Sequence, residues 1–218
     1  GYGPVDSICK FKESYFDNGA LGASPTLFTK SVQNQAASFI AKSLNIQGAI
    51  TTLCQQFLPV SSGMITAYSW LMSGIAERVL LVAVDELIPA IEYFHKKKMV
   101  KGSYFHLGEG VAAMVLEKVS SEQSRCKVII RGDVHEPANS GIDDLDAKSG
   151  FMVKRNNGVD HYCNSSCVVG EFPVRSAIDI VLLAQEINKT GGHGSCYEKY
   201  DKSYRSMGVL RSDENNLC

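Results

Sequence analysis

Cys54 is the cysteine of this 218-residue chain whose position makes it a candidate nucleophile. It ends a run of small and β-branched residues, Ala49–Cys54, and precedes an amphipathic stretch that ends at Gly74. A thiol can attack an acyl group when a neighbouring base or charge activates it. No acid or base stands at a recognisable spacing from Cys54. The sequence therefore favours a buried structural cysteine, and acyl transfer by Cys54 remains the alternative.

Other polar residues carry weaker signals. His106 lies before a Gly-Glu-Gly turn and His193 lies in a Gly-Gly-His-Gly run, and both are predicted to be loop residues. Glu109, between the two glycines of that turn, is predicted to accept backbone hydrogen bonds. Gly108 and Gly110 precede a strand, whereas a dinucleotide-binding loop needs glycines after a strand and at the start of a helix.

No metal or cofactor is expected. His161, Cys163 and Cys167 lie close together in sequence, but a zinc site needs a fourth ligand at a workable spacing, and the chain has no Cys-x-x-Cys pair.

The composition of the chain limits the classes of partner that it is expected to bind. A formal net charge of -1 with 21% charged residues gives no electrostatic reason to expect nucleic acid or a membrane surface. No apolar run approaches the roughly 18 residues of a membrane span, and no signal peptide is evident. The basic run 95–101 is predicted to be a solvated loop, with docking of an acidic partner as the alternative. Seven scattered cysteines indicate a reducing cytoplasm rather than a disulfide framework.

Hydrophobic periodicity predicts a layered α/β domain, because buried strands alternate with amphipathic helices. The run Val79–Val84 is apolar without alternation, which is typical of a central strand covered on both faces. We expect one domain over 1–218, with a core at about 20–132, a polar excursion at about 133–160 and a C-terminal part at about 170–211. The predicted elements are helix 25–44, strand Ala49–Cys54, a helix from Val60 ending at Gly74, strands Val79–Val84, Val111–Leu116 and Cys126–Ile130, helix 174–187 and strand Ser203–Leu210.

Three segments, taken in order, resemble the β-ketoacyl synthase family, particularly its short, chain-length-factor-like branch. They are Ser24–Asn34, Gly74–Glu86 and Leu107–Glu117, which includes Leu-Gly-Glu-Gly followed by a strand. Their order and spacing extend over about residues 20–120, roughly half of the chain. The resemblance implies a layered thiolase-like fold, with one near-complete half and a truncated second half.

The resemblance also implies an active site that lacks its catalytic residues. In active members a cysteine at a sharp strand-to-helix turn attacks an acyl thioester, and two histidines stabilise the charge that develops. Counting by the family's spacings, forward from Gly48 and back from Gly74, leads to Phe57 at the nucleophile position. The matching histidine position holds Glu171. Chain-length factors carry glutamine in place of the cysteine, and the inactive site is expected to be lined by Gln55, Gln56, Phe57, His106 and Glu109.

By resemblance, the chain is expected to be a non-catalytic subunit that pairs with an active ketosynthase in type II fatty-acid or polyketide synthesis, with aryl polyene pathways as one setting. An acyl carrier protein would meet it through that complex. Ala49–Cys54 and part of helix 25–44 are expected at the pairing interface, and the ring of Phe57 is expected to fill the lost site. The alternatives are an acyltransferase that uses Cys54 and a stand-alone acyl-binding or structural homodimer.

Overall fold

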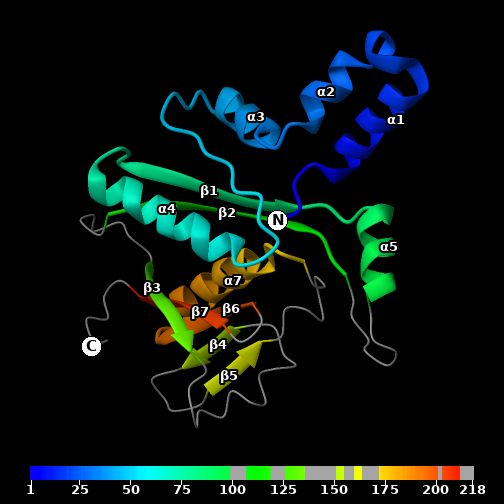
Figure 1. The fold of residues 1–218 in the computed structure, drawn as a ribbon. Helices are drawn as coiled ribbons and strands as arrows, with labels where there is room; N and C mark the ends of the chain where they lie inside the picture. Colours follow the sequence, from blue (N-terminus) through cyan, green and yellow to red (C-terminus); the bar gives the residue numbers. More distant parts are fainter. Residues whose placement is uncertain are drawn as a thin grey trace.

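The computed structural model describes residues 1–98, 107–118, 126–135, 151–154, 160–163, 172–200 and 203–211 (Figure 1). Two antiparallel sheets enclose a helical layer. The first sheet pairs β1 (Arg78–Asp85) with β2 (Gly110–Glu117). The second has the order β3-β7-β6-β4-β5. Its strands are β3 (Cys126–His135), β4 (Phe151–Lys154), β5 (Asp160–Cys163), β6 (His193–Tyr200) and β7 (Ser203–Arg211).

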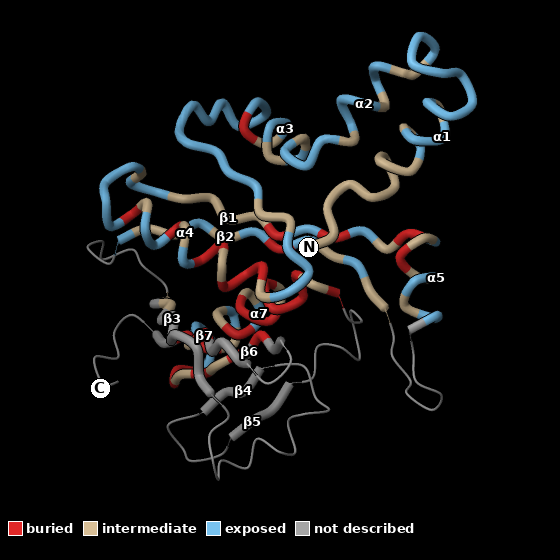
Figure 2. Tube along the Cα trace, viewed as in Figure 1, coloured by how far each residue is buried: buried red, intermediate tan, exposed pale blue. Residues whose placement is uncertain are grey.

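Helix α7 (Arg175–Thr190) is the centre of the molecule, since it contacts β2 on one side and β6 and β7 on the other. Helix α4 (Pro59–Ser73) packs on β1 and also contacts β3. Figure 2 shows buried residues concentrated on these helices and on the adjoining strands. The core comprises Val60 and Met64 of α4, Ala83 and Ala112 of the small β1–β2 sheet, Phe172 and Val174 before α7, Ala177, Ile180, Leu183 and Ile187 of α7, and Cys196, Met207 and Val209 of the large sheet.

Most elements of this body agree with the sequence predictions. Helix α4 ends at Gly74, whose φ of 76° gives the left-handed conformation that glycine tolerates best. Strands β1, β2, β3 and β7 and helix α7 lie where they were predicted. The predicted excursion at 133–160 is wrong in part, because β3 continues to His135 and β4 lies inside that range. His193 was predicted to be a loop residue, but it begins β6 and pairs with Leu210.

The small sheet is not a covered central sheet. Val84 faces Val111 and Leu80 faces Val115 across the β1–β2 pair, so these residues share one face. Val84, Val111 and Val115 are exposed in this chain. The prediction that Val79–Val84 is covered on both faces is therefore wrong for the chain alone. Tyr68 and Met72 of the predicted apolar stripe on α4 are exposed as well.

The strand predicted at Ala49–Cys54 does not form. The segment between α3 and α4 has no regular structure, and Ile50, Thr51 and Thr52 are exposed. A strand needs a neighbour to satisfy its backbone N–H and C=O groups. Among the described residues no strand pairs with this segment. The β-prone composition alone does not make a strand here.

Three helices form an N-terminal arm over residues 5–43. They are α1 (Val5–Gly22), α2 (Pro25–Ser31) and α3 (Gln35–Ser43). The sequence predicted no structure before Ser24, so α1 was missed. The single helix predicted over 25–44 is broken at Val32, which is extended with ψ 138°. Its start is confirmed, because the Ser24 hydroxyl accepts the Leu27 N–H at 3.3 Å and Pro25 takes the first helical position.

Helix α5 (Pro89–Lys98) lies at the far end of the small sheet in Figure 1. It includes His95 and the lysines that follow, so the solvated loop predicted for the run 95–101 is wrong for His95–Lys98. Met99–Lys101 lie outside the described residues. Lys96 pairs with Glu92 one turn earlier at 2.6 Å, as expected of an i,i+4 pair on an exposed helix.

Gly110 shows how closely α7 approaches the small sheet. A methyl group built on its Cα would lie 2.8 Å from the end of Ile178 and 3.0 Å from the ring of Phe172. We predict that Gly110→Ala lowers the free energy of unfolding by about 1–3 kcal/mol, because an added carbon overpacks this contact. Denaturant unfolding measures the change.

Gly48→Ala is the matched control, since nothing lies within 4 Å of the added carbon. It should change the unfolding free energy by less than about 0.5 kcal/mol. Equal stability of the two variants would contradict the close packing of α7 on β2.

Candidate functional site: the start of helix α4

The chain turns sharply into α4 at Leu58. This residue has φ 54° and ψ 35°, the left-handed conformation, although it carries a branched side chain. Such a residue costs about 1–3 kcal/mol and persists only where its surroundings impose it, often at functional sites. The sharp turn predicted at Phe57 is therefore present, and its strained residue is the next one along.

The side chains at this turn are apolar. Phe57, Leu58 and Pro59 follow one another, and none of them can act as a nucleophile. Phe57 is 47% exposed, so the expectation that its ring is buried in the lost site is wrong for this chain. Gln55 and Gln56 are exposed just before the turn.

Cys54 lies before the turn rather than on it. It is half-buried, and a carbon added at Gly3 would come within 3.2 Å of its Sγ atom. Cys54 thus packs against the N-terminal segment of the chain. It follows that Cys54 does not occupy the helix N-terminus, where the dipole of α4 would favour a thiolate.

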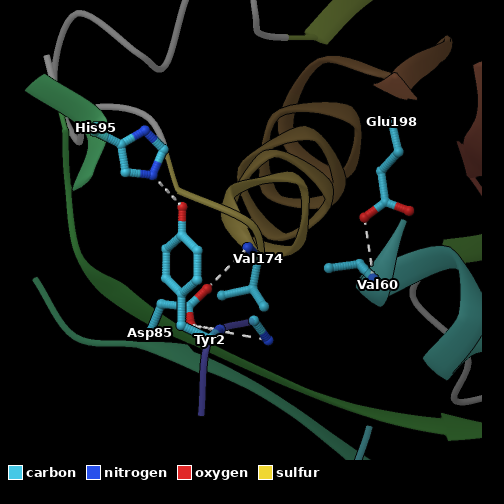
Figure 3. A network of polar contacts seen from close by, with 7 residues as sticks. Tyr2, Val60, Asp85, His95, Val174 and Glu198 are labelled. Carbon is cyan, nitrogen blue, oxygen red and sulfur yellow. Dashed lines mark hydrogen bonds and ion pairs between the residues drawn. The ribbon is translucent and has the colours of Figure 1, made fainter. Parts of the chain in front are cut away.

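A carboxylate occupies the start of α4 instead. Glu198 of β6 is only 6% exposed, and it accepts the Val60 N–H at 3.0 Å and the Ser61 N–H at 2.9 Å. Figure 3 shows its side chain directed at the first turn of α4. The first N–H groups of a helix have no partner within the helix, and they carry the positive end of its dipole. Glu198 satisfies two of them with a negative charge.

The same carboxylate also reaches α7. The Ser176 hydroxyl donates to Glu198 Oε1 at 2.7 Å, so the first turns of α4 and α7 share one acceptor group. Other charges lie close by. Arg175 and Asp179 of α7 are buried, and Arg175 Nη2 lies 3.7 Å from Asp179 Oδ2. A cluster of buried charges thus lies beneath the start of α4.

Cys196 belongs to the same buried region. Its side chain is fully buried on β6. Burial raises the pKa of this thiol well above its usual value, and the negative charges of Asp179 and Glu198 raise it further. The thiol is therefore protonated and enclosed at neutral pH, unlike the thiolate that acyl transfer requires.

A second buried carboxylate, Asp85, fixes the other side of α7. Asp85 ends β1 and accepts the Val174 N–H at 3.2 Å and the Tyr2 N–H at 2.7 Å (Figure 3). Burial raises the pKa of the Asp85 carboxyl, while the chain's amino group and these N–H groups act in the opposite direction. The Tyr2 hydroxyl lies 2.7 Å from His95 Nε2. Burial, followed by the charge of Asp85, raises the pKa of Tyr2. Asp85 therefore ties the N-terminal segment, β1 and α7 together.

The other predicted site residues are not brought to this turn by the described structure. Glu109 is exposed and accepts the Leu87 N–H at 2.9 Å, which confirms that it binds backbone. His106 and Glu171 lie outside the described residues, as does Cys167. Where the structure is described, no group of three or more His, Cys, Asp or Glu side chains could hold a metal ion. No helix in the described ranges is long and apolar enough to cross a membrane.

Sequence reasoning missed Glu198, which is 138 residues from Val60. One signal was available. Cys196 and Glu198 are two apart in sequence, so on a strand both point to the same face, and a reduced cysteine is usually buried. An acidic residue on an inward face calls for a partner, and a helix N-terminus is a suitable one.

Comparisons with known proteins agree with this architecture. A solved structure described as "The ishigamide ketosynthase/chain length factor" superposes with a TM-score of 0.70 at 16% identity, over 96% of this chain and 70% of that chain. This similarity confirms the predicted layered, thiolase-like α/β fold. No curated protein matches.

The sequence itself identifies the family. The family model described as "Beta-ketoacyl synthase, N-terminal domain" matches residues 20–152, which is more than half of the 218 residues. The match includes the turn at Leu58, helix α4 and the β1–β2 sheet. This chain belongs to the β-ketoacyl synthase N-terminal domain family.

Proposed function

We propose that this chain is a non-catalytic, chain-length-factor-like subunit that pairs with an active ketosynthase and shapes the tunnel for its growing acyl chain. One observation carries the proposal. The turn into α4, where active members of the family hold their cysteine, presents Phe57, Leu58 and Pro59. The pathway would be a type II fatty-acid or polyketide synthesis, and aryl polyene formation is one such setting. The acyl carrier protein would reach the chain through the ketosynthase complex.

The N-terminal arm supports the pairing. No residue of α1 or α2 is buried, and α3 buries only Ala41. Figures 1 and 2 show the arm standing away from the body with most of its surface exposed. Helices this short gain most of their stability from packing an apolar face. Phe16, Phe28 and Phe39 are all exposed, so the arm has apolar side chains that a partner would cover.

The exposed surface of the N-terminal arm continues into the segment that precedes α4. A groove of about 700 Å³ lies between the arm and this segment, and it is lined by Ile8, Ser31, Val32, Gln33, Asn34, Ser38, Ile50, Thr51 and Thr52. Its lining mixes apolar side chains with amides and hydroxyls. A β-prone segment without regular structure beside such a groove suits the addition of a strand from another chain. This supports the expectation that Ala49–Cys54 and the α2–α3 region meet the partner.

The first test is enzymatic. The isolated chain, incubated with acyl-loaded and malonyl-loaded carrier protein, should yield no ketoacyl product, because no nucleophile stands at the turn. Product formation requires the ketosynthase partner and is unchanged by Cys54→Ala. Elongation by the isolated chain that disappears in Cys54→Ala would overturn the proposal and establish the acyltransferase alternative.

Restoring a thiol tests the site itself. Phe57→Cys should leave the isolated chain inactive and change its unfolding free energy by less than about 1 kcal/mol, because Phe57 is half-exposed. Met64→Ala, at a 1% exposed position of the same helix, is the control and should cost about 2–5 kcal/mol. Thermal unfolding measures both, since 1 kcal/mol shifts a domain of this size by roughly 2–4 °C. A loss for Phe57→Cys as large as that for Met64→Ala would show that the ring is buried after all.

The pairing is tested by making the same Phe→Asp substitution at two positions, one on the arm and one on α5 as a control. Phe39 on the arm is 61% exposed and Phe94 on α5 is 64% exposed. Phe39→Asp should weaken binding to the ketosynthase at least about tenfold, because it puts a charge into an apolar interface, while Phe94→Asp should leave binding unchanged. Co-purification and a titration by isothermal calorimetry give the affinities. An obligate pair should bury more than about 2,000 Å² in total.

Two results would contradict the pairing proposal. One is a stable monomer at micromolar concentration that is indifferent to a co-expressed ketosynthase. The other is a homodimer in native mass spectrometry that forms without any ketosynthase and does not exchange with it, which would establish the stand-alone alternative.

A further inference from the structure

The first turn of α4 is an anion site that the chain fills with its own side chain. A helix N-terminus attracts anions because its free N–H groups and its dipole point the same way. In α4 the N–H groups of Val60 and Ser61 both donate to Glu198, one to each carboxylate oxygen. Val60 and Ser61 are themselves buried, so no solvent competes for these donors.

Glu198 is held firmly in that place. It lies on β6, which is paired with β7 on one side and β4 on the other. The Ser176 hydroxyl fixes one carboxylate oxygen from the side of α7. The charged groups that face this region from α7 are Arg175 and Asp179, and the neutral thiol of Cys196 lies on β6 itself. An intramolecular carboxylate in this position has no translational entropy to lose on binding, unlike a dissolved anion or an incoming thioester.

We propose that Glu198 is a built-in inhibitor of the ancestral acyl site: its carboxylate occupies the helix N-terminus where a thiolate or a thioester oxyanion would have to lie. This rests on the proposed function, and it adds a second reason for inactivity that is independent of the missing cysteine. A nucleophile restored at the turn would remain unreactive as long as Glu198 stays in place.

The negative charge of Glu198 determines the pKa expected of a thiol at this turn. A cysteine at a helix N-terminus normally has a lowered pKa, because the N–H groups and the dipole stabilise the thiolate. Glu198 already neutralises that end of α4, and its negative charge opposes a second one nearby. A thiol at position 58 therefore behaves as an ordinary thiol in this chain, and removing the charge of Glu198 makes it acidic.

The experiment replaces the strained residue Leu58 with cysteine, once with Glu198 intact and once with Glu198 replaced by glutamine. Leu58→Cys and the double variant Leu58→Cys/Glu198→Gln are alkylated with iodoacetamide across pH 5–10, and each cysteine is followed by peptide mass spectrometry. The pKa of the introduced thiol should be lower by about one unit in the double variant, with alkylation at pH 7 about five- to tenfold faster. Cys54, four residues away on the same segment, is the internal control and should react identically in both proteins.

Identical pH profiles for the introduced thiol in the two backgrounds would overturn the proposal. Rapid alkylation of the fully buried Cys196 would show instead that Glu198→Gln unfolds the chain. In that event hydrogen exchange of the unaltered protein decides. The Val60 and Ser61 amides should exchange at least about a hundredfold more slowly than the amide of Thr26, in the first turn of the exposed helix α2, and exchange at the same rate would overturn the proposal. Neither measurement involves a ketosynthase, so failure here leaves the pairing proposal standing.

Discussion

The buried carboxylate of Glu198 is the contact on which the rest of this structure depends. A carboxylate transferred from water to a protein interior is costly unless it is fully hydrogen-bonded. Glu198 receives two backbone N–H groups of α4 and the hydroxyl of Ser176 on α7. Charge-assisted bonds of this kind are about twice as strong as neutral ones. The arrangement is satisfied only when β6, α4 and α7 are all in place, and so it fixes their relative positions.

Asp85 does the same on the other side of α7. It joins the end of β1 to the start of α7 through Val174, and to the N-terminal segment through Tyr2. Between them the two carboxylates hold the first turn of α7, while its apolar residues fill the space between the sheets. Hydrophobic contact alone is not directional. The two carboxylates fix the relative orientation of the packed elements, because each accepts hydrogen bonds from particular backbone groups.

Local signals were enough to predict α4, α7 and strands β1, β2, β3 and β7, whereas features that depend on contacts between residues distant in sequence were missed. Helix α4 was predictable because its periodic apolar residues end at Gly74, and α7 because Pro173 precedes a strong apolar stripe. Ala49–Cys54 has the composition of a strand, but a strand exists only when another lies beside it. Val84, Val111 and Val115 are likewise exposed, although the apolar pattern of this sheet predicted cover on both faces. Glu198 was missed because its partners are far away in sequence, although its alternation with Cys196 indicates an inward face.

The failures at Ala49–Cys54 and on the face of the β1–β2 sheet are of one kind, and they bear on function. The residues that the sequence places in a core or a sheet, and that the chain leaves exposed, are the uncovered face of β1–β2, the segment before α4 and the aromatic residues of the arm. A sequence pattern records what is buried in the working assembly, whereas the structure of one chain records only what that chain buries by itself. The buried carboxylates of Glu198 and Asp85 receive their hydrogen bonds from groups of this same chain. In the described structure the arm and the small sheet leave apolar residues exposed, and the proposed pairing with a ketosynthase would cover them.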